Sequence, residues 1–405
     1  MTKSMRLLFV YDHRFFRDDT GAVFTSGSLP NHVWSRYLEH FDSVEVLARD
    51  GGPAPARHGL ASSSQAGVSF NLIPNLTTFR QQIFRPRDLD RRIRASLASC
   101  SAALIRLPSE LGFLAAAECR KMGKPYAIEV VGCAWDGMFN HGSLLGRLYA
   151  PLFYLRARRA IRHAPLALYV TSKWLQGRYP TEGRSFPASD VEIVPLTEAE
   201  TKTRQERLRE IANGQRPQLG TVASLRIRSK GIQTALAALG DLRKQGLDFS
   251  YRVLGTGDPA PWQKLAAELG IADLVSFDGV RPAGKGVRDW LDGIDIHLQP
   301  SFQEGLPRAT IEAMSRGIAC IGSTCGGIPE LIPAGRTHEP GDVRRLAECI
   351  RSLATDSAAL ADASAADSAT AQNYLPERLS MRRAEFFEAL KAMAEPGPAS
   401  PVAHE

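Results

Sequence analysis

The sequence lacks several patterns that would define its class. Its six cysteines, at positions 100, 119, 133, 320, 325 and 349, form no CxxC pair and no regular spacing. This argues against a disulfide framework and favours reduced thiols in the cytoplasm. No metal-binding cluster stands out, so we expect no metal and no other cofactor. No apolar run approaches the ~18 residues that a membrane span needs. The segment Met5–Tyr11 is too short for the apolar core of a signal peptide, and we expect a first strand there.

Signatures of nucleic-acid binding are also missing, although the net charge of +7 is unevenly placed. Residues 1–195 hold 25 Lys and Arg against 16 Asp and Glu, whereas residues 196–405 hold 25 against 27. A basic first half could face nucleic acid, anionic lipid or a phosphorylated acceptor. No zinc spacing, RNA-binding signature or helix-turn-helix pattern accompanies it, so we expect no nucleic-acid partner.

What the chain does have is a double set of alternating strands and helices. Its 405 residues predict two domains, each large enough for a core of its own. Alternation of short apolar runs with amphipathic stretches predicts parallel sheets covered by helices, with one short strand over 192–194. The Ala-, Ser- and Asp-rich segment 357–368 predicts a weak surface helix or loop. We expect an N-terminal domain over 1–195, a charged linker over 196–217, a second domain over 218–375, a C-terminal helix over 376–395 that packs back on the first domain, and a disordered tail over 396–405.

One stretch, Ser301–Ile332, concentrates the chemistry. Glu304 lies in a tight turn ending in Pro307, and the segment from Arg308 to Arg316 predicts a short helix stopped by Gly317. A turn whose amides open into a helix N-terminus can bind phosphate. Glu312 follows Glu304 by eight residues, or roughly 10 Å of helix rise. Two carboxylates at that spacing can bind hydroxyls at the two ends of one elongated ligand.

This stretch resembles the donor-binding signature of family 4 glycosyltransferases, which have the GT-B fold. The resemblance rests on E-G-L-P, E-A-M and G-G-I-P-E-L-I. It implies that Glu304 binds the hydroxyls of the transferred sugar and that Glu312 binds the ribose of the nucleotide. The backbone of the segment that contains Gly305, Leu306 and Pro307 would line the sugar and phosphate. Ala319 replaces a proline that is usual in the family, a change at the start of a strand.

A second stretch, Thr221–Gly231, places three cations, Arg226, Arg228 and Lys230, between a strand and a helix. Cations there suit a diphosphate leaving group, whose charge grows as the glycosidic bond breaks. The resemblance implies a clamp made of an arginine and a Lys-Gly pair, and Lys230-Gly231 matches the latter. Ser224 occupies the usual arginine place, so either Arg226 or Arg228 would substitute. The resemblance implies that Gly255, Gly257, Val280 and Arg281 lie beside the bound nucleotide. The turn with Gly255 and Gly257 is not a dinucleotide-binding fingerprint, because the third glycine of that motif is missing.

In the first half, two polar loops follow predicted strands. The stretch from Tyr11 to Pro30 is long for a strand–helix loop, and its Gly27 would let backbone approach a phosphate or sugar. The second loop carries Asp136 and His141, which are candidates for contact with the sugar or the acceptor. Loops at the carboxyl ends of parallel strands face ligands, but a lone Asp or His in a loop is more often structural.

The segment Arg147–His163 predicts a helix with Leu148, Leu152 and Leu155 on one stripe and four arginines in its second half. Such a helix could lie on a membrane surface. It could equally pack its leucines on the core and leave a solvated basic end, and we expect this second arrangement. A further basic group, Arg80 to Arg94, keeps an anionic membrane surface among the candidate partners.

The resemblance implies an α/β chain of the GT-B type, with two Rossmann-like domains facing a central cleft. It further implies a retaining transferase that moves a hexose from a nucleotide-diphosphate sugar to a glycan or polyprenyl-linked acceptor, as in bacterial surface polysaccharide synthesis. We expect it in the cytoplasm or on the inner face of the membrane. Two alternatives stay open: a GT-B nucleotide-sugar epimerase, and a catalytically silent scaffold.

Overall fold

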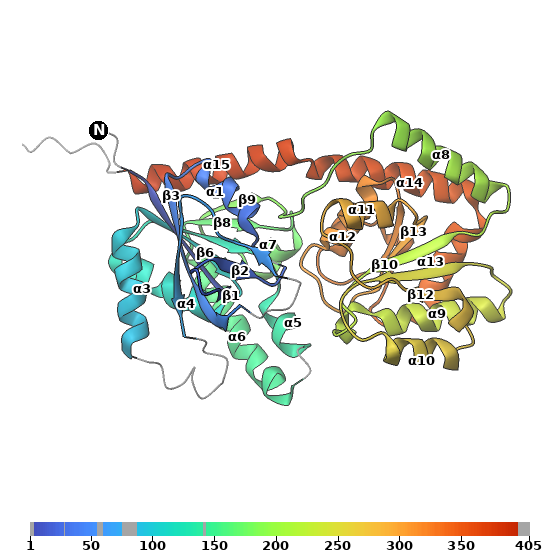
Figure 1. Cartoon of the computed structure of the whole chain (residues 1–405), viewed down its shortest axis with the longest axis horizontal. Coiled ribbons are helices and arrows are strands. Elements are labelled where there is room, and N and C mark those ends of the chain that lie inside the picture. Colours follow the sequence, from blue (N-terminus) through green and yellow to red (C-terminus); the bar gives the residue numbers. More distant parts are fainter. Residues whose placement is uncertain (1–3, 28, 55–59, 75–86, 141–142, 396–405) are drawn as a thin grey trace, which may run out of the picture.

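The computed structural model describes residues 4–27, 29–54, 60–74, 87–140 and 143–395, which form two α/β domains lying side by side (Figure 1). Within these residues the first domain has a nine-stranded sheet and the second a six-stranded one. Both sheets are parallel apart from the short strands β2 and β4. The predicted GT-B arrangement of two Rossmann-like domains is confirmed.

In the N-terminal domain, helices cover both faces of the sheet. Its strands are β1 (Arg6–Arg17), β2 (Val23–Thr25), β3 (Ser43–Pro53), β4 (Ala61–Ser62), β5 (Val68–Ile73), β6 (Ala102–Leu107), β7 (Tyr126–Val130), β8 (Leu166–Tyr169) and β9 (Arg184–Pro187). Its helices are η1 (Asn31–Trp34), α1 (Ser35–Leu38), α3 (Arg87–Ser99), α4 (Glu110–Met122), α5 (Ala134–Phe139), α6 (Leu144–Arg162) and α7 (Trp174–Arg178). Successive residues of a strand face opposite sides of its sheet. Leu8 and Val10 therefore join the core under α3, α4 and α6, whereas Leu7 and Phe9 join the core on the other face.

The second domain places its binding loops at a reversal in strand order. Its strands are β10 (Gln218–Val222), β11 (Ser250–Leu254), β12 (Val275–Phe277), β13 (Ile296–Gln299), β14 (Ala319–Ser323) and β15 (Thr337–His338). The helices of the second half are α8 (Glu198–Ala212), η2 (Arg228–Lys230), α9 (Ile232–Lys244), α10 (Ala260–Glu268), η3 (Ala272–Leu274), α11 (Lys285–Leu291), α12 (Arg308–Ser315), η4 (Ile328–Glu330), η5 (Ala334–Arg336), α13 (Val343–Thr355), α14 (Ser357–Ala371), η6 (Gln372–Tyr374) and α15 (Pro376–Ala394). The order β12-β11-β10-β13-β14-β15 makes β10 and β13 neighbours. Ligands of open α/β sheets bind where the order reverses, at the carboxyl ends of such strands.

The helix α15 crosses from the second domain to the first (Figure 1). Its Phe386, Phe387 and Leu390 are buried in the core that also contains Leu7 and Phe9. The tail predicted over 396–405 lies outside the described residues. The predicted linker segment is mostly helical, because α8 fills it and packs on α14 of the second domain.

A carboxylate also joins the two domains. Glu330, in η4 of the second domain, accepts hydrogen bonds from the backbone N–H groups of Ser172 (2.6 Å), Lys173 (3.0 Å) and Trp174 (2.6 Å). These amides open α7 in the first domain and would otherwise lack partners within the helix. Glu330 therefore acts as an N-terminal cap that crosses the domain junction.

Several local predictions are wrong. The predicted loop after Tyr11 begins as strand, because β1 continues to Arg17 with Phe15 buried and pairs with β2 as a hairpin. No strand forms at 192–194; the edge strand is β9 instead. The segment over 357–368, expected to be a weak surface helix or loop, lies within α14, which buries Leu360 and Asp367. Asp367 pairs with Arg336 at 2.5 Å, so a polar contact invisible in the low-complexity sequence holds this helix.

The expectation that α6 packs its leucines on the core is also wrong. Leu148, Leu152 and Leu155 are exposed, and the buried face carries Phe153, Ile161 and three alanines. The leucines and the alanine-rich face both recur at helical spacing. The prediction chose the leucines as the buried face because they are more hydrophobic. The small alanine side chains let this helix lie close to the sheet, which leaves the leucines outside.

Candidate functional site

A cavity of about 770 Å³ lies between the two domains. Seven of the predicted site residues line it: Gly27 from the first domain, and Lys230, Glu304, Gly305, Leu306, Pro307 and Glu312 from the second. The residues of the second domain come from the loops after β10 and β13, at the reversal in strand order. The fold thus brings together two segments that the sequence separates by more than seventy residues.

At the centre of this cavity Lys230 and Glu304 form an ion pair. The Lys230 Nζ donates to Glu304 Oε1 at 2.6 Å. The same oxygen accepts from Ser301 Oγ at 2.8 Å and from Gln299 Nε2 at 3.0 Å. The Glu304 side chain is only 9% exposed, so these donors replace water around its charge. An ammonium held against a carboxylate in this way is already positioned to meet an anionic group that enters the cavity.

Backbone contacts hold the two loops against each other. Phe302 N donates to Ser229 O at 2.7 Å. Gly231 has φ +78° and lies so close to Pro300 that a Cβ there would meet the Pro300 carbonyl oxygen at 1.8 Å. Gly326 is similarly required, because a Cβ on it would lie 2.3 Å from the Glu304 carbonyl oxygen. The glycines of both motifs therefore allow the close approach that pairs Lys230 with Glu304.

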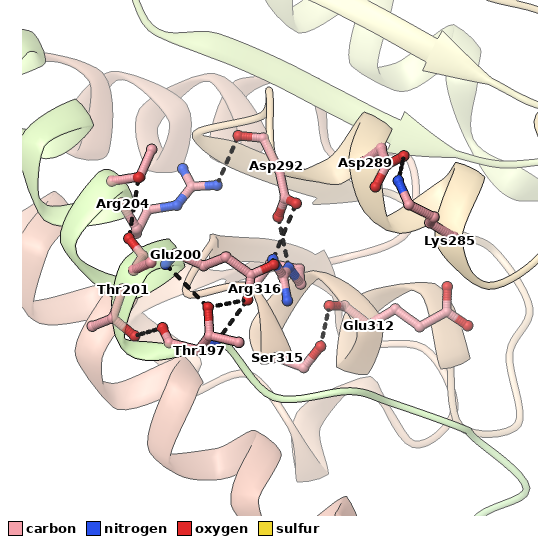
Figure 2. A network of polar contacts seen from close by, with 12 residues as sticks. Thr197, Glu200, Thr201, Arg204, Lys285, Asp289, Asp292, Glu312, Ser315 and Arg316 are labelled. Atoms are coloured by element: carbon pink, nitrogen blue, oxygen red, sulfur yellow. Dashed lines mark hydrogen bonds and ion pairs between the residues drawn. The ribbon is translucent and has the colours of Figure 1, made fainter.

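Glu312 lies on α12, whose bounds agree with the predicted helix and whose end is followed by Gly317 at φ +64°. Burial raises the pKa of its carboxyl above the ordinary value; Arg308 opposes this shift and Glu192, from the first domain, adds to it. No hydrogen bond from the described residues reaches this carboxylate. Figure 2 shows it pointing away from the neighbouring Arg316 network. Glu312 is therefore a half-buried acceptor that lines the cavity, and no described residue donates a hydrogen bond to its carboxylate.

The other end of α12 is tied to the linker. Arg316 is buried; its Nε donates to Asp292 at 2.6 Å and its Nη2 to Glu200 at 2.6 Å (Figure 2). Glu200 also accepts from Thr197 N in the capping box that starts α8. The Thr197 amide and the Arg316 guanidinium lower the pKa of Glu200 to about 2. The helix that carries Glu312 is thus connected directly to the segment between the domains.

The first-domain wall contains a charged group that the sequence reading missed. Arg106, in the otherwise apolar β6, pairs with Glu129 of β7 at 3.3 Å and with Asp190 at 3.0 Å. Arg106 and Glu129 are both buried. Burial alone would raise the pKa of Asp190, but Arg106 and, across the cleft, Arg308 lower it below the ordinary value. The sequence did contain a sign of this ion pair. Arg106 is a single charged residue in an apolar strand, and a buried charge needs a partner of opposite sign.

His13 lies on the same wall, with its Nε2 2.6 Å from Thr25 Oγ1. Burial, followed by the charges of Arg106 and Arg14, lowers its pKa to about 4. The imidazole is therefore neutral at neutral pH and can offer or accept one hydrogen bond, but it carries no charge to the cavity.

The comparisons with known proteins agree with this geometry. Residues 216–356 match the family model described as "Glycosyl transferases group 1", a range that contains Lys230, Glu304 and Glu312. The chain is 28% identical to protein CapJ of Staphylococcus aureus over 354 residues, which cover 85% of either chain. The resemblance to glycosyltransferases with the GT-B fold is confirmed.

Two further matches, one to a sequence and one to a solved structure, cover different shares of the chain. The putative colanic acid biosynthesis glycosyltransferase WcaL of Salmonella typhimurium is 36% identical over 118 residues, which are 27% of this chain and 28% of that one. The structure of HepE from Anabaena, in complex with UDP and glucose, superposes with a TM-score of 0.65 at 16% identity, covering 95% of this chain and 100% of HepE. The GT-B fold thus extends over both domains, and the comparisons support glycosyltransferase activity.

Other predicted residues of this glycosyltransferase-like site lie away from the cavity lining: Arg226, Arg228, Gly255, Gly257, Val280, Arg281 and Asp136. The Arg228 guanidinium lies over the ring of Trp262, 5.8 Å from its centroid. Asp136 pairs with Arg178 at 3.8 Å. His141 lies outside the described residues. The roles assigned to these residues stay predictions.

A second cavity, of about 960 Å³, also lies at the domain junction. Its lining includes Tyr154, Trp174, Arg178 and Glu330 but none of the predicted site residues. We therefore assign the chemistry to the cavity that contains Lys230 and Glu304.

Among the described residues no group of three or more His, Cys, Asp or Glu is placed to hold a metal ion. In the same part of the chain no helix is both long and apolar enough to cross a bilayer.

Proposed function

We propose that this chain is a retaining, family 4 glycosyltransferase that takes a hexose from a nucleotide-diphosphate sugar. The observation that carries the proposal is the Lys230–Glu304 ion pair beside the partnerless carboxylate of Glu312, all within one cavity. The complex of HepE with UDP and glucose makes a uridine nucleotide the first donor to test.

Each residue has a chemical task in this proposal. Glu304 accepts hydrogen bonds from sugar hydroxyls, and Glu312 accepts them from the ribose, which supplies the donors that its carboxylate lacks. Lys230 neutralises the diphosphate as it leaves, without a metal or cofactor. Because charge on the β-phosphate increases toward the transition state, the ammonium binds that state better than the ground state.

The proposed displacement occurs on one face of the sugar. The bond from C1 to the phosphate oxygen breaks while a bond from C1 to the acceptor oxygen forms on the same side. The acceptor hydroxyl gives its proton to the departing phosphate oxygen, so no separate base is required. The proposed acceptor is a glycan or polyprenyl-linked saccharide of bacterial surface polysaccharide synthesis. The name of WcaL, a putative colanic acid biosynthesis glycosyltransferase, supports a role in polysaccharide synthesis. We place the reaction in the cytoplasm, consistent with six free cysteines.

The two alternatives are not favoured. An epimerase would need carboxylates around the sugar ring from the first domain, where Glu129 and Asp190 are paired with Arg106 and Glu192 is paired with Arg36. A silent scaffold assigns no chemical task to the Lys230–Glu304 pair in the cavity.

A thermal-shift screen with UDP, GDP, ADP and CMP, followed by assays of donor hydrolysis, tests the proposal. We expect one nucleoside diphosphate to raise the melting temperature and its sugar derivative to be hydrolysed slowly without acceptor. If no nucleotide binds, the donor site is wrong. If a nucleotide binds but neither hydrolysis nor transfer occurs with any sugar derivative of that nucleotide, the scaffold alternative replaces the enzyme.

A further inference from the structure

The helix α6 presents an apolar face to solvent. Its five exposed leucines are between 52% (Leu152) and 74% (Leu144) accessible: Leu144, Leu145, Leu148, Leu152 and Leu155. These positions fall on one side of the helix, since residues three, four, eight and eleven apart share a face. The opposite side, with Phe153 and Ile161, packs in the core of the first domain. Monomeric proteins rarely leave a contiguous apolar face uncovered, and such faces mark interaction sites.

The helix itself carries only basic charged side chains, and at its C-terminal end Arg162 pairs with Glu182 at 2.7 Å. No Asp or Glu occurs between Asp136 and Glu182, an interval that holds seven Lys and Arg. Arg147, Arg158 and Arg159 are exposed on α6, and none of them forms an ion pair with an acid among the described residues. By contrast Arg156, nearer the buried side, pairs with Glu110 at 2.7 Å. Arg147 lies over the ring of Phe139, 5.7 Å from its centroid, and all three arginines flank the leucines on the exposed side of the helix.

Exposed leucines bordered by arginines, with no acid between them, are complementary to an anionic lipid surface. Leucine side chains enter the boundary between headgroups and acyl chains, while long arginine side chains reach the phosphates. Each basic residue near such a surface adds about fivefold to binding, and salt screens that part of the attraction. We propose that the leucine face of α6 docks this chain on an anionic bilayer.

Docking through α6 also positions the domain junction. Arg158 belongs to the lining of the second cavity, together with Lys173 and Arg382. We include these cations in the proposed lipid-facing surface, because Arg158 belongs to α6 itself. This inference does not depend on which donor the cleft binds, because α6 contributes no residue to the lining of the cavity with Lys230.

Co-sedimentation of the full chain with vesicles tests the proposal. Vesicles of phosphatidylcholine alone are compared with vesicles of equal parts phosphatidylcholine and phosphatidylglycerol, at low and high salt. The variant is Leu148→Gln/Leu152→Gln, and the matched control is Met381→Gln/Met393→Gln, which removes two exposed apolar side chains from α15.

We expect the parent to bind the anionic vesicles at low salt, and binding to weaken as salt increases. The double leucine variant should lose about tenfold or more in partitioning, since each buried leucine contributes substantially to insertion. Arg158→Gln/Arg159→Gln should lose about fivefold for each arginine. The methionine control should bind like the parent. Because all four leucine and methionine positions are exposed, the melting temperatures of these two variants should match that of the parent.

Three results would overturn the proposal. The parent could fail to sediment with anionic vesicles at low salt, or the leucine variant could sediment as well as the parent. The parent could also form a dimer without lipid that Leu148→Gln/Leu152→Gln converts to a monomer, which would assign the face to a second copy. Nucleotide binding measured on the same samples shows whether the donor site stands independently of these outcomes.

Discussion

The two walls of the cleft are built in different ways. The wall from the second domain takes Lys230, Glu304 and Glu312 from two short segments inside the range matched by the family model. The wall from the first domain takes Arg106 from strand β6 and Asp190 from the segment after β9, both outside that range. Both walls contain an ion pair, Lys230 with Glu304 and Arg106 with Glu129 and Asp190. The second domain adds the carboxylate of Glu312, to which no described residue donates a hydrogen bond. We infer that the second domain binds the charged donor and the first provides a rigid surface opposite it.

The largest expected effect is the loss of stability when Arg106 is replaced. In Arg106→Leu the buried Glu129 loses its cation, which should lower the free energy of unfolding by about 3–5 kcal/mol. Urea denaturation measures this, with the exposed Arg351→Leu as control. Arg106→Leu/Glu129→Leu should recover most of the loss. Unchanged stability together with lost nucleotide binding would mean that this wall, too, is a ligand site.

Lys230→Ala tests the opposite wall. The variant should lower the catalytic rate by about 10²–10³-fold, while the Michaelis constant for the donor changes much less. Arg226→Ala and Arg228→Ala, assayed beside it, show which arginine replaces the one missing at Ser224. Since Glu304 keeps its bonds to Ser301 and Gln299, the fold should survive. Turnover near the parental rate would refute the assignment of this loop.

A substitution of Glu330 tests whether its hydrogen bonds to the first domain help to hold the two domains together. Glu330→Gln removes a charge-assisted cap from three amides of the first domain. If this costs about 1.5–3 kcal/mol of local stability, hydrogen exchange at the amides of Ser172, Lys173 and Trp174 should accelerate about 10–100-fold. The exposed Glu339→Gln serves as control. Unchanged exchange would show that the domains meet without this contact.

A smaller effect should appear with pH. An ionised Glu312 accepts hydroxyl donors, and a protonated one does so poorly. Because burial raises its pKa, nucleotide affinity should decrease as pH falls through that raised value, and Glu312→Ala should show less of this decrease. Calorimetric titrations of both proteins at several pH values measure the difference. Equal pH dependence in the two proteins would assign it to another group.

The sequence predicted the second domain better than the first, for a physical reason. The helix that carries Glu312 follows from a local motif that Gly317 ends. The contact of Lys230 with Glu304 was not predicted, because it joins two segments 74 residues apart. Strand β1 was predicted too short, since the pairing that extends it to Arg17 involves β2 and β3, which are not local. Arg106 and Glu129 were missed because the ion pair exists only when β6 and β7 lie side by side.

The helix α6 illustrates a different limit. Its leucine stripe and its alanine-rich stripe both have helical spacing, so periodicity could not tell which one faces the core. Only the packing of Phe153 and Ile161 against the first domain decides this. The sequence correctly predicted an amphipathic basic helix. The prediction that its leucine face packs on the core was wrong, because the leucines are exposed.

The central claim, that the second domain binds the nucleotide through Glu312, is tested most directly by calorimetry. The nucleotide that gives the largest thermal shift is titrated into the parent, Glu312→Ala and the exposed control Glu348→Ala. We predict that Glu312→Ala loses about 1.5–3 kcal/mol of binding free energy, the worth of a charge-assisted hydrogen bond, while the control matches the parent. Equal affinity of parent and Glu312→Ala for the nucleotide would contradict the claim.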